Sequence, residues 1–333
     1  MYPFRTLALF LPLALWACEP AEEEFTQPPP SAQTDPDATK SNATNARSSV
    51  LVFQDNFETG CWRAFDHKRA EGGSCEAGVL WYNSQMQSNA AGRVVQEVGE
   101  PAVALPPRSG NHAMKFTWFR DGYRPDDSNN TSKAHLWSRF EFKTNTTRWY
   151  SFSMFLPSGS GGMDPDTEPE ILVQWHGRPN FENGEPFRIP VAAISHLGSR
   201  LVFIYHYDPA EMSTVSSPQR GGSIELGQAT QDQWIDFLIR VRWDPQGDGY
   251  LEINRKDQVE GASWQRLFKQ TNGVKIGYND ISDPNVGIGI YKHDAGKRHR
   301  NGEPLSDYYR RQVFFDEFRI GNEQSVPADV QPR

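Results

Sequence analysis

Most of the chain after residue 49 consists of short apolar runs, in which apolar and polar residues often alternate. In one run, Ile235, Phe237, Ile239 and Val241 fall on the same face of an extended chain. A period of two is typical of β-strands, because successive side chains point to opposite faces. Gly, Pro, Asn and Asp separate the runs, as expected for turns. The pattern predicts strands at residues 49–57, 111–119, 135–143, 148–157, 170–177, 189–197, 200–208, 233–244, 249–257, 285–293 and 311–321.

These strands predict an all-β fold, since no long amphipathic helix and no repeat of fixed period accompanies them. So many short strands favour one domain, residues 50–323, built as a single large antiparallel sandwich or barrel. Residues 324–333 are left as a C-terminal tail. The polar segments 121–134 and 206–232 are expected to form the walls of a groove.

The first 18 residues have the features of a secretory signal, with an apolar run at 7–15 that is too short for a permanent membrane span. Residues 15–18 resemble a bacterial lipobox, which predicts that Cys18 is lipidated; ordinary cleavage near Ala17 is the alternative. The next residue is Glu19 and not the aspartate associated with retention in the inner membrane, which favours the outer membrane. We therefore expect an exported protein of a Gram-negative bacterium, either an outer-membrane lipoprotein held only by its lipid or a periplasmic or secreted protein.

Residues 19–49 are rich in Pro, Ser, Thr, Asn, Ala and Glu and predict a disordered tether. The tether carries a net charge of −4 and the signal +1, so residues 50–333 carry −5 of the total of −8. A mildly acidic domain argues against a nucleic-acid-binding protein, which needs a broad basic surface. Any anionic ligand must be met by a local group of Arg and Lys.

The chain has three cysteines. If Cys18 is lipidated or removed, Cys61 and Cys75 remain, and an exported protein can oxidise them to a disulfide. Two reduced thiols buried apart are the alternative.

Polar residues that could take part in catalysis or substrate binding occur inside three of the predicted strands. Gln174 and His176 are two residues apart and share a face, and so do Arg139 and Glu141. Tyr291 ends a late strand, and a basic segment at 296–300 follows it.

This set suits β-elimination from a uronic acid polymer, in which the C5 proton is removed and the C4 oxygen is expelled. The carboxylate beside C5 opposes the reaction unless an amide, an arginine or an imidazolium neutralises it. A base must take the C5 proton and an acid must protonate the leaving oxygen. A tyrosine can do both if cations lower the pKa of its hydroxyl from about 10.

The motif Gln174-Trp175-His176, the later segment 289–292 and the closing run 314–321 resemble the jelly-roll polysaccharide lyases related to heparin lyase I and glucuronan lyase. The order Arg-x-Glu, Gln-x-His, Tyr is also similar to that of alginate lyases. The resemblance implies a concanavalin A-like jelly-roll sandwich with a concave substrate groove.

Carried over by residue, the resemblance makes His176 the general base or carboxylate neutraliser and Gln174 a donor to the carboxylate. Tyr291 becomes the acid, with the base role open to it as well, and Arg139 holds the substrate carboxylate. One departure is Gly287, where these families often have a lysine; Lys292 or the segment 296–300 could supply the charge. The residues expected to bind substrate are Arg120, Glu141, Lys292, Lys297, Arg298 and Arg300.

The predicted function is therefore a polysaccharide lyase, acting as a monomer on an anionic polymer of alginate or glucuronan type and leaving 4,5-unsaturated ends. A glycan-binding surface lipoprotein is the alternative that needs no acid or base. A jelly-roll glycoside hydrolase is disfavoured, since Glu170 is followed on its strand by Leu172 and Gln174 rather than by a second carboxylate.

No cofactor is required for this chemistry. A structural Ca²⁺ is left open, with Asp55, Glu58 and Asp316 as candidate ligands, provided that the first and last strands lie side by side.

Overall fold

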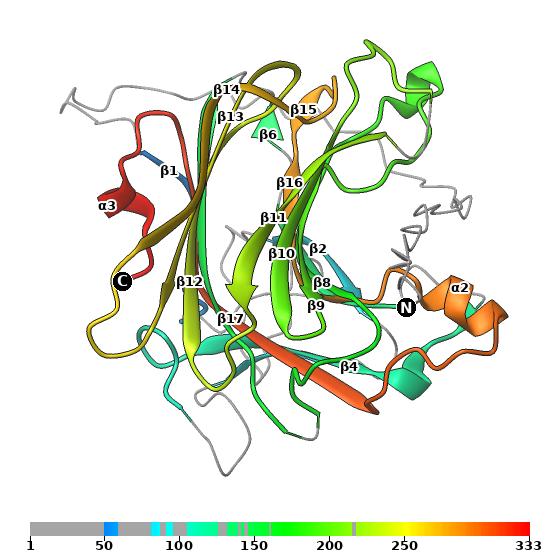
Figure 1. Ribbon diagram of the computed structural model, residues 1–333, viewed down its shortest axis with the longest axis vertical. Coiled ribbons are helices and arrows are strands. Elements are labelled where there is room, and N and C mark those ends of the chain that lie inside the picture. The colour runs from blue at the N-terminus through cyan, green and yellow to red at the C-terminus, as the bar shows by residue number, and fades with distance from the viewer. Residues whose placement is uncertain are drawn as a thin grey trace, which may run out of the picture.

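The computed structural model is a sandwich of two antiparallel sheets (Figure 1). It describes residues 50–58, 81–86, 91–95, 105–125, 132–138, 141–142, 146–159, 161–214 and 218–333. The all-β sandwich expected from the sequence is thereby confirmed.

The larger sheet has eight strands, in the order β14-β13-β12-β7-β17-β4-β3, with β1 paired to β17. Its strands are β1 (Leu51–Asp55), β3 (Ala91–Val95), β4 (Ala113–Phe119), β7 (Thr147–Phe155), β12 (Trp234–Arg242), β13 (Asp244–Asp257), β14 (Gln265–Ile276) and β17 (Arg310–Gly321).

The second sheet has seven strands, in the order β11-β10-β9-β8-β16-β5-β2. Its strands are β2 (Trp81–Met86), β5 (Lys133–Ser138), β8 (Glu170–His176), β9 (Ala192–Leu197), β10 (Arg200–Tyr207), β11 (Gln219–Gln228) and β16 (Asn285–Tyr291). Outside the two sheets lie the strand pair β6 (Glu141–Phe142) and β15 (Ser282–Asp283), the 3-10 helices η1 (Arg120–Gly122) and η3 (Phe181–Asn183), and the helices α2 (Ala295–Arg300) and α3 (Pro327–Val330).

Each of the eleven expected runs contains a strand, and the differences concern the less patterned segments. Residues 219–228 form the edge strand β11, although 206–232 was expected to be a groove wall. The edge strand β14 was missed because most of its residues are exposed and few are apolar. The basic segment after Tyr291 is not a loop but helix α2.

Aromatic side chains from both sheets fill the space between them. Trp175 is fully buried, with ring centroids 5.6 Å from Tyr150, 5.7 Å from Phe203 and 6.4 Å from Trp243. Burying one large apolar side chain stabilises a fold by about 1.5–3 kcal/mol. Trp175 therefore anchors β8 with Gln174 and His176 on the opposite side of the sheet.

A bulge in β8 decides which side chains point inward. Ile171 pairs with Ser195 but Val173 pairs with Ile194, so Leu172 is an extra residue relative to β9. Both Leu172 and Val173 lie in the core as a result. Unbroken alternation along residues 170–177 would place Glu170 and Leu172 on the face of Gln174 and His176; the bulge makes this expectation wrong.

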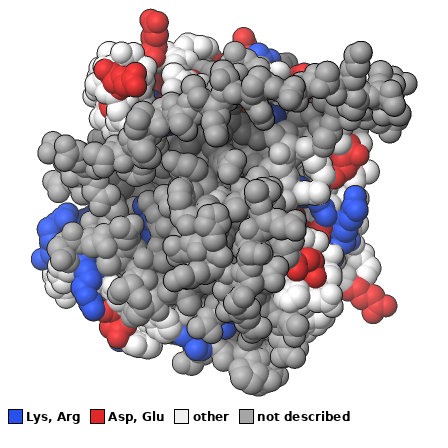
Figure 2. Space-filling view, turned by 180° about the vertical axis from the view of Figure 1, so that it is seen from behind, with Lys and Arg blue, Asp and Glu red and all other residues white. Residues whose placement is uncertain are grey.

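The first and last strands lie side by side, since β1 pairs antiparallel with β17. The end of the chain is packed against the larger sheet rather than hanging free: Val330 of α3 is buried against Trp149 and Leu238. None of the described helices has the length and apolar character needed to span a membrane. Seen from behind, the described surface carries Lys and Arg interspersed with Asp and Glu (Figure 2).

Candidate active site

The candidate site lies on the outer face of the seven-stranded sheet, the side that points away from the other sheet. Three neighbouring strands contribute to it. Alternation turns Lys133, His135 and Trp137 of β5 to this face, while Ala134 and Leu136 enter the core. Tyr291 of β16 lies opposite Lys133, and Gln174 of β8 lies opposite Gly287.

Two glycines of β16 make room for the rings of β5. A Cβ atom at Gly287 would lie 2.8 Å from the Trp137 ring, and one at Gly289 would lie 2.8 Å from Cδ2 of His135. Gly289 also has a φ of +137°, which side-chain-bearing residues rarely adopt. The lysine that related families often carry at the position of Gly287 is thus replaced by space for Trp137.

A continuous row of rings crosses this face. Centroid distances are 6.2 Å from His176 to Trp137, 5.8 Å from Trp137 to His135 and 6.1 Å from His135 to Tyr291. The structure therefore brings Tyr291 next to His135, with His176 at the far end of the row.

Gln174 and His135 are joined directly. The amide nitrogen of Gln174 lies 3.1 Å from Nδ1 of His135 and donates to it, so the proton of the neutral ring sits on Nε2. Burial, followed by the charge of Lys133, lowers the pKa of His135 from 6.5 to about 3, while the carbonyl of Ile171 acts in the opposite direction. His135 is therefore a neutral imidazole at physiological pH.

His176 is also held neutral. Its Nδ1 lies 2.8 Å from the carbonyl oxygen of Gly177 and donates to it, and the Phe187 ring stacks on it at 4.8 Å. Burial lowers the pKa of His176 to about 4, although the carbonyls of Gly177 and Arg188 oppose this and Lys133 adds to it. A neutral ring cannot neutralise a carboxylate by charge.

The structure separates His176 from Tyr291. Tyr291 lies opposite Ile171, five residues from His176 on β8, which is roughly 17 Å of extended strand. The C5 proton and the C4 oxygen belong to one sugar ring, so two groups this far apart do not act on the same bond. The expected pairing of His176 as base with Tyr291 as acid does not fit this geometry.

Lys133 is the cation that the structure places at Tyr291. Its ammonium lies 4.7 Å from the centroid of the Tyr291 ring, and the residue is only 8% exposed. Neither Lys133 nor His135 was among the residues predicted from the sequence. Alternation could have found them, because both precede Trp137 and Arg139 at intervals of two.

Lys292 points the other way, into the sandwich. It is 0% exposed, with Nζ 2.7 Å from Asp166 and 2.8 Å from Glu170. Arg311 of β17 binds both oxygens of Glu170, at 2.8 and 2.9 Å. We call Asp166, Glu170, Lys292 and Arg311 the interior ion cluster. The prediction that Lys292 binds substrate is wrong, because its side chain is buried on the opposite side of the sheet from Tyr291.

The basic helix α2 lies beside the Tyr291 end of the outer face (Figure 1). Arg298 is engaged there, with its guanidinium 2.6 Å from Glu168 and 3.4 Å from Glu303. Lys297 and Arg300 are exposed on this helix. Arg120 of η1 is also exposed, and it donates to the carbonyl of Ser306 at 3.2 Å.

Several predicted residues lie outside the described part of the chain. These are the lipidation site Cys18, the cysteine pair Cys61 and Cys75, and Arg139, while Glu141 is described only in its backbone. The signal and tether also lie outside it. These remain predictions.

The three carboxylates considered for Ca²⁺ already accept hydrogen bonds from N–H groups. Asp55 accepts from Phe57 and Trp81, both at 2.7 Å. Glu58 accepts from Asn111 and His112 at 2.7 Å. Asp316 accepts from Ser109 at 3.1 Å and Glu317 at 2.7 Å, and burial raises its pKa to about 8.

N–H groups that point at these oxygens do not suit a cation site. Among the described residues, no group of three or more His, Cys, Asp or Glu is placed to hold a metal.

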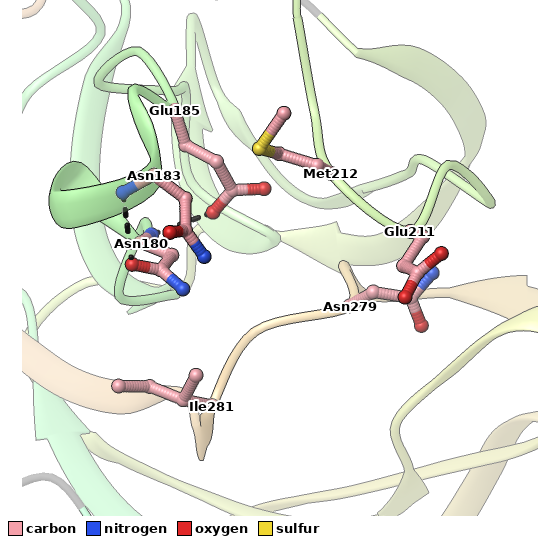
Figure 3. Close-up of a pocket in the computed structure, with 7 residues that line it drawn as sticks. All are labelled: Asn180, Asn183, Glu185, Glu211, Met212, Asn279 and Ile281. Carbon is pink, nitrogen blue, oxygen red and sulfur yellow. Dashed lines mark hydrogen bonds between the residues drawn. The ribbon is translucent and has the colours of Figure 1, made fainter.

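Beyond His176, three loops border an open pocket of about 400 Å³ (Figure 3). The loop after His176 carries η3 and supplies both Asn180 and Glu185; Glu185 accepts from the backbone of Asn180 at 2.6 Å and of Ser213 at 2.7 Å. This end of the outer face therefore offers amides and carboxylates where the Tyr291 end offers cations. The lining residues are Asn180, Asn183, Glu185, Glu211, Met212, Asn279 and Ile281.

Comparison with known proteins assigns a class to this sandwich and its outer-face site. The sequence profile of the polysaccharide lyase family matches residues 57–319. The chain belongs to this family and is an enzyme that cleaves a polysaccharide. A search of curated proteins found no match.

Among solved structures, the chain is similar to the endo-β-1,4-glucuronan lyase of the fungus Trichoderma reesei. The identity is 19% and the TM-score 0.55, over 76% of this chain and 94% of that one. It also matches the PL-14 alginate lyase of Aplysia kurodai (13%, TM-score 0.41, 64% and 84% covered) and the PL7 alginate lyase AlyA1 of Zobellia galactanivorans (13%, TM-score 0.40, 73% and 95% covered). At these identities the likeness concerns the fold.

Proposed function

We propose that this lyase acts on a uronic-acid-containing polysaccharide of alginate or glucuronan type, with Tyr291 as the group that transfers the proton. The observation that carries the proposal is the meeting of Tyr291, His135 and Gln174 on one face of the sheet. Tyr291 is partly exposed, whereas His135 and Gln174 are 0% and 2% exposed. Tyr291 therefore reaches the sugar, and the other two lie beside it in the floor of the site.

In the reaction, the Tyr291 oxygen takes the C5 proton of a uronate. The electron pair of the C5–H bond forms the C4–C5 double bond, and the C4–O bond breaks with its electrons going to the leaving oxygen. The leaving oxygen then takes this proton from the Tyr291 hydroxyl. No water is consumed, and the products carry one 4,5-unsaturated uronate and one new hydroxyl end.

The neutral histidine fits this scheme as a source of dipoles rather than of charge. Nδ1 of His135 accepts from Gln174, so Nε2 carries the proton of the neutral ring. An N–H group fixed in a buried place stabilises developing negative charge without reorganisation. We assign Gln174 and His135 to this role, and His176 to contact with a neighbouring sugar unit.

The charge distribution supports a polymer whose only anions are carboxylates. The chain has a net charge of −8, and the described residues visible from behind carry charges of both signs (Figure 2). A densely sulfated polymer would need a broad basic surface. Here the cations gather at one end, with Lys297 and Arg300 on α2.

The test follows the ultraviolet absorbance of the 4,5-unsaturated uronate with the full chain and a panel of alginate blocks, glucuronan, hyaluronan, heparan and pectate. We expect a rise on alginate or glucuronan, and a loss of about 100-fold or more in kcat for Tyr291→Phe, the range typical of a lost acid–base group. Tyr250→Phe, which removes a hydroxyl from the other sheet, is the matched control. A rise confined to a sulfated polymer would reject the substrate class, and full activity in Tyr291→Phe would reject the mechanism.

A further inference from the structure

Tyr291 can remove a proton only after losing its own, so the site needs a positive charge that favours the anionic oxygen. This requirement rests on the proposed function. Any cation that meets it must lie close to the tyrosine and be shielded from water, because water screens exposed charges strongly.

We propose that Lys133 is the positioning residue that stabilises the negative charge of Tyr291 during the elimination. Its ammonium lies 4.7 Å from the Tyr291 ring centroid. The two residues are paired directly across β5 and β16, so their relative position is set by the backbone ladder. Lys133 is 8% exposed, which keeps its charge effective at this distance.

The neighbouring basic residues are engaged elsewhere. Lys292 lies in the interior ion cluster, between Asp166 and Glu170. Arg298 is held by Glu168 and Glu303. A lysine at position 287 is excluded, because its Cβ would lie 2.8 Å from the Trp137 ring. Lys133 is thus the described cation that faces Tyr291 from the adjacent strand.

Other titratable groups near Tyr291 do not take over this role. His135, on the same strand as Lys133, is neutral because its pKa is lowered to about 3 by burial and by Lys133 itself. His293, with its ring centroid 6.2 Å from that of Tyr291, has its pKa lowered to about 4 by burial, although Asp294 opposes this. Lys133 is therefore the basic group that the described structure sets against Tyr291, beside neutral histidines.

Kinetics distinguish an effect of Lys133 through Tyr291 from direct binding of the substrate carboxylate by Lys133. If Lys133 acts through Tyr291, Lys133→Met lowers kcat about 100-fold or more and leaves KM within about threefold. The pH at which kcat is half-maximal also rises in this variant, since more hydroxide is needed to deprotonate the tyrosine. Lys133→Arg keeps the charge and should retain kcat within about tenfold.

The experiment measures kcat, KM and their pH profiles on the best polymer for wild type, Lys133→Met, Lys133→Arg and Lys269→Met. Lys269, an exposed residue of β14, is the matched control, and thermal unfolding of each variant establishes folding. In a Tyr291→Phe background, Lys133→Met should cause no further loss. A variant that raises KM with unchanged kcat, or one that keeps the wild-type pH profile, overturns the proposal. Activity abolished by Tyr291→Phe in the same series leaves the proposed function standing.

Discussion

Two lysines flank Tyr291, and they lie in opposite environments. Lys133 faces the outer surface beside the tyrosine ring, while Lys292, the residue that directly follows β16, is buried among Asp166, Glu170 and Arg311. Inside the sandwich, Lys292 and Arg311 form ion pairs with Asp166 and Glu170. On the outer face, the Lys133 ammonium lies over the aromatic ring of Tyr291. The contacts of a side chain in a strand therefore depend on which face of the sheet it points to, and neighbouring residues in the sequence have different partners.

The interior ion cluster joins β8 of one sheet to β17 of the other through Glu170 and Arg311. Although burial opposes ionisation, Arg311 and Lys292 hold the pKa of Glu170 well below its ordinary value. Removing one partner of such a set leaves a buried charge without compensation. The cluster should therefore matter for folding and the outer face for catalysis.

The largest expected effect is that of Lys292→Met, which should lower the free energy of unfolding by about 3–5 kcal/mol. Lys133→Met is the matched comparison and should lower it by less than Lys292→Met does, because Lys133 lies on the outer face against the Tyr291 ring and outside the interior ion cluster. Urea unfolding of both variants measures the difference. Equal losses would show that the two lysines do not differ as the structure indicates.

A smaller effect concerns pH and His135. Its pKa of about 3 in the folded state lies below 6.5, so between these values the unfolded chain binds more protons and the stability supplied by the neutral ring is lost as pH falls. The destabilisation caused by His135→Gln should therefore be smaller at pH 4.5 than at pH 7, by up to about 2.7 kcal/mol.

Urea unfolding of wild type and His135→Gln at the two pH values checks this, since the buried carboxyls cancel in the comparison. A destabilisation that does not change with pH would show that His135 titrates normally in the folded protein.

The smallest effect tests the room left for the rings of β5. Gly287→Ala forces its Cβ toward Trp137 and should lower the free energy of unfolding by about 1–3 kcal/mol, with loss of activity. Gly296→Ala, in helix α2, is the control of opposite sign: its Cβ meets Tyr123 at an ordinary 3.4 Å, and alanine should stabilise the helix by about 0.5–1 kcal/mol. Thermal unfolding with activity assays distinguishes the two. A destabilised Gly296→Ala with an unaffected Gly287→Ala would reverse the assignment.

The sequence alone determined the all-β class and the eleven alternating runs that contain strands, because alternation is a local property that survives in the fold. It also singled out Gln174 and Tyr291, which the structure brings to one face beside His135.

Only the tertiary structure decided which polar residues meet. The bulge at Leu172 turned Glu170 into the core, and the pairing of β5 with β16 set Lys133 and His135 beside Tyr291. Pairing between strands joins residues more than 150 positions apart, and a one-residue bulge reverses the facing of every residue beyond it. Local patterns carry neither kind of information, so the neighbours of Tyr291 were fixed by the fold.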